Sequence, residues 1–171
     1  MLAAGPVLYV AEMESSRIAA IPFFADLPED EVAAVASKAF EVEIGSGQAL
    51  AAEGRLGHSL FAIESGTADV VMDGATVRTI GTGDIVGELA VFASPPDPFA
   101  SPEVAEGGLR TASVVATSPM RLIGLFKRDV WALDQRAPVA AQRLRTVLDG
   151  RRADDAQRAV AKQRPQDEAG G

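Results

Sequence analysis

The sequence predicts a mainly β domain with flanking helices, built as a jelly-roll-like antiparallel β-barrel. Between positions 40 and 86 the chain is a succession of short stretches rich in β-branched and aromatic residues. Glycines separate these stretches at intervals too short for helices: Gly45, Gly47, Gly54, Gly57, Gly66, Gly74, Gly81 and Gly83. On both sides of this region the apolar residues recur at helical spacing instead. Glycines this close together mark turns between antiparallel strands, and a barrel is the architecture that such strands favour.

Two short helices are expected before the strands, and residues 1–14 form an N-terminal extension. Residues 15–20 are expected to make a short helical turn that Pro22 ends. Pro28 suits the first turn of a second helix, where Glu29 and Glu31 lie near the positive end of the helix dipole. The apolar residues of this second helix fall on one face, namely Val32, Val35, Ala36 and Ala39.

The strands themselves are short and regularly interrupted. Six are expected in the glycine-rich region, at residues 40–44, 48–52, 59–64, 67–72, 76–80 and 84–86. Two more, at residues 111–117 and 120–126, are joined by a turn at Ser118-Pro119. All eight are expected to contribute to one barrel.

Two further helices are expected after the strands. The first covers residues 127–135, with Val130, Trp131 and Leu133 as packing residues. Pro138 begins the second, and its apolar stripe comprises Val139, Leu144, Val147 and Leu148. Gly150 is expected to end or loosen this helix. The domain therefore spans residues 15–149, and residues 150–171 form a basic helical extension followed by a tail that is expected to be disordered beyond Lys162.

Length and composition limit what this domain can be. With 171 residues, the chain is long enough for one domain with a core and too short for two substantial ones. No apolar run approaches the roughly 20 residues that span a bilayer, and the first residues lack the basic and apolar pattern of a secretory signal. The chain has no cysteine, which excludes disulfides and thiolate metal sites. We expect a cytoplasmic protein that is not inserted in a membrane.

The charge distribution argues against DNA as a partner. The formal net charge is −8, and residues 1–142 carry 9 Lys/Arg against 19 Asp/Glu. An acidic surface of this kind repels a polyanion. Residues 143–164 reverse the balance, with 7 basic against 3 acidic residues, which is typical of a solvated helical face near a helix C-terminus.

Two short stretches carry the chemistry. Gly87-Glu88-Leu89-Ala90 offers a carboxylate, and Arg110-Thr111-Ala112-Ser113 offers a guanidinium. A carboxylate can accept a hydrogen bond from a ribose hydroxyl, and the fork of an arginine side chain can hold a phosphate with two hydrogen bonds. Together the two stretches suit a cyclic nucleotide.

These stretches, the order of the elements and the segment Leu60-Phe61-Ala62-Ile63-Glu64-Ser65-Gly66 resemble the cyclic nucleotide-binding domain family over residues 15–149. The resemblance implies that Glu88 binds the ribose 2′-hydroxyl and that Arg110 binds the cyclic phosphate. It also implies a role for their neighbours: an apolar wall from Val86, backbone N–H donors near Gly87, Leu89, Ala90 and Ala112, and a hydroxyl from Thr111. The implied ligand is cyclic AMP, with cyclic GMP as the alternative.

One departure from the family concerns the segment between the two stretches. Glu88 and Arg110 are 22 positions apart, whereas the corresponding residues usually lie closer together, and residues 93–109 form an insert. The insert contains four prolines and three acidic residues but no basic residue. Three roles remain open for it, namely a passive surface loop, a lid or a plug that fills the pocket.

Other functions find little support in the sequence. His58 is the only histidine, so a metal-dependent cupin enzyme lacks its ligands, and no nucleophile elbow accompanies His58 for a hydrolase. The residues after the last helix contain no helix-turn-helix pattern. We therefore expect a non-enzymatic sensor that acts through an unknown downstream protein or as a homodimer, with the helix from Pro138 as a lid or a dimer seam. The alternative is a barrel that binds no nucleotide and serves as a scaffold for protein interactions.

Overall fold

The computed structural model describes residues 7–9, 13–54, 59–87, 91 and 112–163. Within these residues, helices lie between β1 and β2 and again after the last strand. In chain order they are α1 (Ser15–Ala20), the 3-10 turn η1 (Pro22–Phe24), α2 (Glu29–Lys38), α4 (Lys127–Arg136) and α5 (Pro138–Gln163). The strands are β1 (Val7–Tyr9), β2 (Phe40–Ile44), β3 (Ala49–Ala51), β4 (Ser59–Ser65), β5 (Ala68–Met72), β6 (Ala75–Ile80), β7 (Ile85–Val86), β8 (Ser113–Ala116) and β9 (Met120–Phe126).

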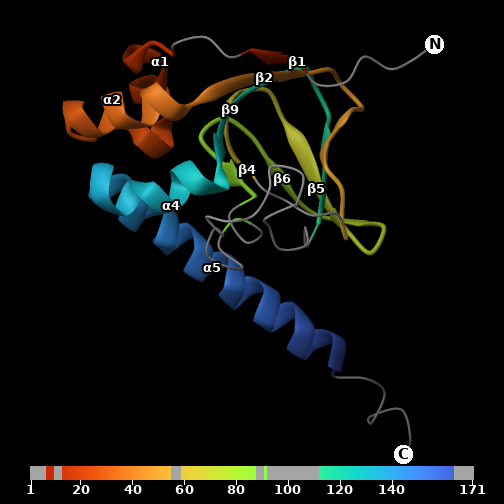
Figure 1. Ribbon diagram of the computed structural model, residues 1–171. Helices are drawn as coiled ribbons and strands as arrows, with labels where there is room; N and C mark the ends of the chain where they lie inside the picture. The colour runs from red at the N-terminus through yellow and green to blue at the C-terminus, as the bar shows by residue number, and fades with distance from the viewer. Residues whose placement is uncertain (1–6, 10–12, 55–58, 88–90, 92–111, 164–171) are drawn as a thin grey trace, which may run out of the picture.

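The strands form two antiparallel sheets that face each other. The five-stranded sheet has the order β1-β2-β9-β4-β7, and the four-stranded sheet has the order β3-β8-β5-β6. The helices gather at one end of this sandwich, with α1 and α2 beside α4 and the first half of α5 (Figure 1). The predicted fold class is confirmed: a jelly-roll-like β structure lies between N-terminal and C-terminal helices.

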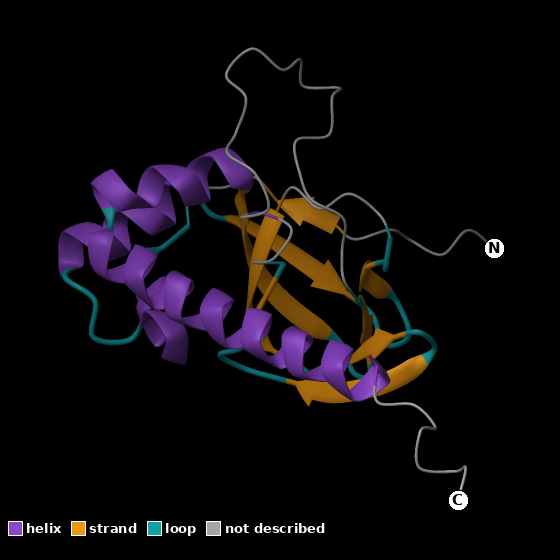
Figure 2. Ribbon diagram, turned by 90° about the horizontal axis from the view of Figure 1, so that it is seen from below, coloured by secondary structure: helices purple, strands orange, loops and turns teal. Residues whose placement is uncertain are grey.

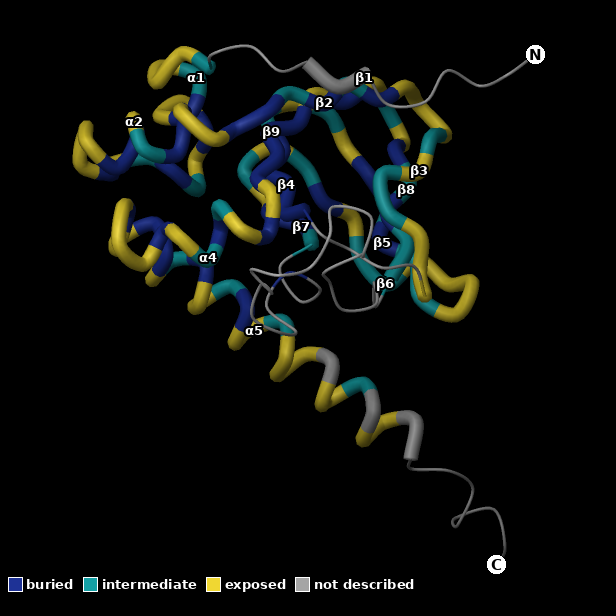
Figure 3. Tube along the Cα trace, viewed as in Figure 1, coloured by how far each residue is buried: buried dark blue, intermediate teal, exposed yellow. Residues whose placement is uncertain are grey.

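Two apolar clusters hold the layers together (Figure 3). The sandwich cluster fills the space between the sheets and comprises Phe40, Val42, Ile44, Phe61, Ile63, Ala68, Val70, Ile80, Val86, Val114, Ala116, Met120 and Leu122. The helical cluster joins the helices to the outer face of β4 and β9, and its largest fully buried members include Ile18, Phe24, Leu60, Leu125 and Leu144. β4 serves both clusters because successive side chains of a strand point to opposite faces.

A glycine in β9 makes room for the ring of Phe40. A Cβ atom at Gly124 would lie 2.3 Å from Cζ of Phe40, a distance that real side chains do not reach. The Phe40 ring also packs edge-to-face on Phe61 and stacks on Phe126, with ring centroids 6.2 and 4.5 Å apart. Gly124 is therefore part of the packing of the sandwich, and its place in an apolar strand is explained by this contact.

An ion-pair network ties α1 to the five-stranded sheet. Arg17 donates to Glu41 of β2 at 3.2 Å and to Glu64 of β4 at 2.9 Å. Its hydrogen bond to Glu41 holds the pKa of that carboxyl below its ordinary value, and the same bond raises the pKa of the Arg17 guanidinium. The network is half-buried, so it fixes the direction of α1 while adding modestly to stability.

Several details differ from the sequence predictions. Residues 7–9 of the expected N-terminal extension form β1, which pairs with β2 at the edge of the five-stranded sheet. α5 passes through Gly150 without a break and reaches Gln163. Val139, expected in the apolar stripe, is 41% exposed, because the buried face at the start of α5 is formed by Ala140 and Ala141. Most other boundaries agree to within two residues.

The remaining expectations concern segments outside the described residues, namely the tail beyond residue 163, His58 and the insert at 93–109. No helix in the described part of the chain is both long and apolar enough to cross a membrane.

Candidate functional site

The first motif begins where β7 ends. Val86 pairs with Phe61 of β4 and is buried in the sandwich cluster. Gly87 follows with φ = 93°, a backbone conformation that residues with a Cβ atom rarely adopt, so glycine is required here for its backbone freedom. The carbonyl of Gly87 accepts a hydrogen bond from the N–H of Val91 at 3.1 Å, the spacing of an α-helical bond.

The second motif leads into the opposite sheet. Ala112 packs against the sandwich cluster, and β8 follows from Ser113 between β3 and β5. The hydroxyl of Ser113 accepts a hydrogen bond from the backbone N–H of Glu53 at 2.9 Å, and Val114 is buried. This motif therefore enters β8 at a point that neighbouring strands fix on both sides.

The two motifs converge on one apolar interior. Val86 belongs to the sandwich cluster from the five-stranded sheet, and Ala112 contacts the same cluster from the four-stranded sheet. The structure thus places Val86 and Ala112, whose motifs are separated in the chain, against the same apolar interior. Five predicted site residues lie outside the described residues: Glu88, Leu89, Ala90, Arg110 and Thr111. Glu88 directly follows Gly87 in the chain, and Arg110 precedes Ala112 by two positions.

α4 is tied to the first motif through its tryptophan. The indole Nε1 of Trp131 donates a hydrogen bond to the carbonyl of Val91 at 3.1 Å, and Val91 is completely buried in the helical cluster. Val130 and Leu133 of the same helix are buried as expected, and Trp131 packs partly against the cluster. Val91, which is bonded to Gly87, is therefore connected to the helical layer by a hydrogen bond and by apolar packing.

α5 extends from the helical layer across the strands (Figure 2). The buried carboxylate of Glu31 in α2 accepts hydrogen bonds from the first free N–H groups of α5, those of Val139 and Ala140, each at 3.1 Å. Arg143 donates to the carbonyls of Phe23 and Ala25 at 2.9 and 2.6 Å. From the sequence, Glu31 was expected to interact with the dipole of its own helix, α2. The structure shows that it caps the N-terminus of α5 instead.

Farther along, two arginines of α5 contact the strands beside the motifs. Nη2 of Arg151 donates to the carbonyl of Ile85 in β7 at 3.3 Å, and Nη1 of Arg158 lies 3.7 Å from the sulfur of Met72 in β5. Sequence reasoning assigned these cations to a solvated face. The missed signal is their spacing, since positions 144, 148, 151 and 158 fall on one side of a helix and the first two are buried leucines.

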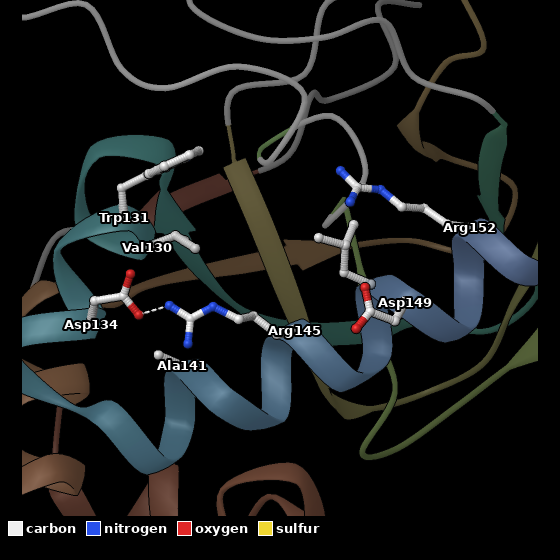
Figure 4. A pocket seen from close by; sticks show the side chains of 8 residues that line it. Val130, Trp131, Asp134, Ala141, Arg145, Asp149 and Arg152 are labelled. Atoms are coloured by element: carbon white, nitrogen blue, oxygen red, sulfur yellow. Dashed lines mark hydrogen bonds and ion pairs between the residues drawn. The ribbon is translucent and has the colours of Figure 1, made fainter.

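A groove of about 290 Å³ lies between α4 and α5. Its wall includes Val130, Trp131, Ala141 and Leu148, and its rim carries the ion pair of Asp134 with Arg145 together with Asp149 and Arg152 (Figure 4). Within the described residues, no group of three or more histidine, aspartate or glutamate side chains is placed to hold a metal ion.

The sequence matches a family of known proteins and a characterised relative. Residues 41–137 match the model of the family described as "Cyclic nucleotide-binding domain". The chain is 30% identical over 112 residues to a cAMP-dependent protein kinase regulatory subunit of Yarrowia lipolytica, a match that covers 66% of this chain and 24% of that protein. The chain therefore spans only about a quarter of that relative.

Solved structures show the same fold. The catabolite activator protein of Thermus thermophilus superposes with a TM-score of 0.64 at 27% identity, over 83% of this chain and 62% of that one. A cyclic nucleotide-binding domain from Methylobacillus flagellatus superposes with a TM-score of 0.61 at 23% identity, over 88% of this chain and 83% of that one. The family model covers more than half of the sequence, and it includes both β7 and β8. The chain belongs to the cyclic nucleotide-binding domain family.

Proposed function

We propose that this domain binds a cyclic nucleotide and serves as a regulatory module rather than as an enzyme. Cyclic AMP is the proposed ligand, and cyclic GMP is the alternative. The observation that carries the proposal is the convergence of two motifs: Val86 and Ala112 reach one apolar interior from facing sheets. A ligand held between the ends of these motifs would meet an apolar wall, a glycine backbone and the two charged residues of the motifs.

Glu88 and Arg110 are the proposed principal contacts. The carboxylate of Glu88 would accept a hydrogen bond from the ribose 2′-hydroxyl, and the guanidinium of Arg110 would bind the exocyclic oxygens of the phosphate through two parallel hydrogen bonds. A hydrogen bond to a charged group contributes about 1.5–3 kcal/mol. Arg110 is thus the side chain on which the affinity would depend most, with Leu89, Ala90, Ala112 and Thr111 completing the site.

Two relatives support this reading by their names. One is a regulatory subunit of a kinase that depends on cyclic AMP, and the other is a catabolite activator protein. α5 would transmit the binding event, because it contacts β7 near the first motif and also extends beyond the sandwich. Such a signal requires that the ligand bind two positions of α5 with unequal affinity. The output would pass to another protein or to a second copy of the chain.

Calorimetric titration tests the proposal. The chain is titrated with cyclic AMP, cyclic GMP and linear AMP, followed by Arg110→Ala and by the control Arg128→Ala, which removes an exposed arginine of α4. We expect binding of a cyclic nucleotide, a loss of about a hundredfold or more in Arg110→Ala, since two charged hydrogen bonds are lost, and no change in the control. If the folded chain binds neither cyclic nucleotide at high micromolar concentration, the scaffold function replaces this proposal.

A further inference from the structure

The groove between α4 and α5 has an apolar wall and a charged rim. Val130 and Trp131 of α4 form the wall together with Ala141 and Leu148 of α5. Its volume of about 290 Å³ is at the lower limit of sites for small ligands, so it suits one or two side chains of a peptide. In Figure 4 the side chains of Trp131 and Arg152 extend from different helices toward the same space.

The chain reaches the edge of this groove directly before the insert. Val91 is buried in the helical cluster, and its carbonyl accepts the hydrogen bond from the indole of Trp131 at 3.1 Å. The next residue that the structure describes is Ala112. Residues 92–111 therefore start from a point that is bonded to the wall of the groove. An extended chain covers up to about 3.5 Å per residue, so the first half of the insert is long enough to enter the groove.

The composition of the insert suits an aromatic groove. Its first half contains the sequence Ser94-Pro95-Pro96-Asp97-Pro98-Phe99. Prolines favour the extended polyproline II conformation, and grooves lined by aromatic residues bind proline-rich segments because little further entropy is lost. Phe99 is the only aromatic residue at positions 93–109, and Asp97 is the acidic residue nearest to it in the chain.

We propose that the groove between α4 and α5 is the docking site of the insert, with Phe99 beside Trp131 and the carboxylate of Asp97 near the guanidinium of Arg152. Two aromatic rings attract each other in edge-to-face or offset contact. At the rim, Arg145 is engaged by Asp134, whereas Arg152 extends toward the space beside Trp131 (Figure 4). In this arrangement the insert lies on the helical layer, and the space between the two motifs stays open to a nucleotide.

The insert has an advantage over any separate occupant of the groove. It is covalently attached beside the wall, and a short flexible connection gives a segment an effective concentration in the millimolar range. A second copy of the chain, or another protein at micromolar concentration, competes poorly with such a segment. The groove is therefore assigned to the insert.

Disulfide trapping tests this contact, because the chain has no cysteine of its own. The groove pair combines Ala100→Cys, next to Phe99, with Asp149→Cys at the rim. The control pair combines Ala100→Cys with Ala132→Cys, which replaces an exposed residue of α4 outside the groove lining. Both double variants are oxidised in a glutathione buffer at low micromolar concentration, and non-reducing electrophoresis separates products within one chain from products between two chains.

We expect the groove pair to close about tenfold faster than the control pair, because docking holds the two cysteines within the short distance that a disulfide requires. Equal rates would show that the insert has no preferred position on the helices, which would overturn the inference. A product that joins two chains would assign the groove to a second copy and would overturn it as well.

A third substitution in the groove pair identifies the side chain that makes the contact. Phe99→Ala should slow closure to about the rate of the control pair, whereas Val104→Ala, in the second half of the insert, should leave the rate unchanged. Equal slowing by both would contradict a specific role of Phe99. Circular dichroism checks that each variant keeps its fold. Nucleotide titration is a separate measurement, so a chain that binds no nucleotide would end the proposed function and leave this inference standing.

Discussion

The two halves of α5 are held in place by different forces. Residues 138–149 bury four apolar side chains, Ala140, Ala141, Leu144 and Leu148, and two further anchors, Glu31 and Arg143, fix them to the N-terminal helices. Among the side chains described in residues 150–161, only Arg151 and Arg158 are less than exposed. One half is thus part of a core, and the other rests on the strands through polar contacts.

Within one helix, the first half therefore contributes to the stability of the fold, whereas the second half is free to change its contacts. Burial of several apolar side chains is the larger contribution to stability, whereas a single hydrogen bond such as that from Arg151 to the carbonyl of Ile85 contributes about 1 kcal/mol. The first half can remain fixed while the second half changes its contacts. A segment with this low local stability is the kind that takes part in conformational change.

Removal of a core side chain from the first half should have the largest effect. Leu144 is fully buried, so Leu144→Ala should lower the free energy of unfolding by about 2–5 kcal/mol. Val160→Ala provides the control in the second half, because that side chain is 58% exposed, and its effect should stay within about 0.5 kcal/mol. Urea denaturation measures both. Similar losses in the two variants would contradict the division of the helix.

Removal of the Glu31 carboxylate, by which α2 caps the N-terminus of α5, tests this anchor. Glu31→Ala leaves the N–H groups of Val139 and Ala140 without their carboxylate, and we expect a loss of about 2 kcal/mol in the free energy of unfolding. Glu29→Ala, which removes an exposed carboxylate from the same helix, should cost less than about 1 kcal/mol. An equal effect of both substitutions would mean that the interhelical bonds contribute nothing beyond the dipole of α2.

Gly150 lies at the junction of the two halves and provides a test with the opposite sign. No atom lies within 4 Å of the position that its Cβ would occupy, and the residue is inside a helix, so Gly150→Ala should raise the free energy of unfolding by about 1 kcal/mol. Gly66→Ala is the contrasting variant. Its Cβ would lie 2.4 Å from the carbonyl oxygen of Pro119 at φ = 96°, so it should destabilise the sandwich. A destabilising Gly150→Ala would show that α5 must bend there.

Arg151→Ala should have the smallest effect on global stability, about 0.5 kcal/mol, and a clear local effect. Loss of the bond to the carbonyl of Ile85 releases the second half, so amide hydrogen exchange in residues 153–161 should accelerate while that in residues 141–148 stays unchanged. Arg152→Ala, an exposed neighbour, should change neither. Uniform acceleration along the whole helix would show that α5 opens as one unit.

Local patterns in the sequence were sufficient to predict most helices and strands of this fold. Glycine spacing and β-branched composition predicted the strands, and residues 40–44 and 120–126 agree with the observed bounds. The first β-strand, β1, was not predicted, because it has three residues and depends on pairing with β2, a long-range contact that local composition does not encode. The family follows from the same patterns together with two motifs in the right order.

Long-range contacts also limited the prediction of the site. Val86, Gly87 and Ala112 were identified from the motifs, and the structure brings Val86 and Ala112 to one interior. The link from Glu31 to the N-terminus of α5 joins residues more than a hundred positions apart, and no sequence period indicates it. The arginines at positions 151 and 158 carried a helical spacing, but charge alone gave no reason to place them against strands.

The chain carries its own optical probe of the first motif. Trp131 is its single tryptophan, and the indole donates a hydrogen bond to the carbonyl of Val91, whose own N–H is bonded to the carbonyl of Gly87. Any displacement of Val91 relative to α4 changes the polarity and hydrogen bonding around the indole. Intrinsic fluorescence can therefore report changes at the contact between Trp131 and Val91 without an added label, for example in a stopped-flow mixing experiment.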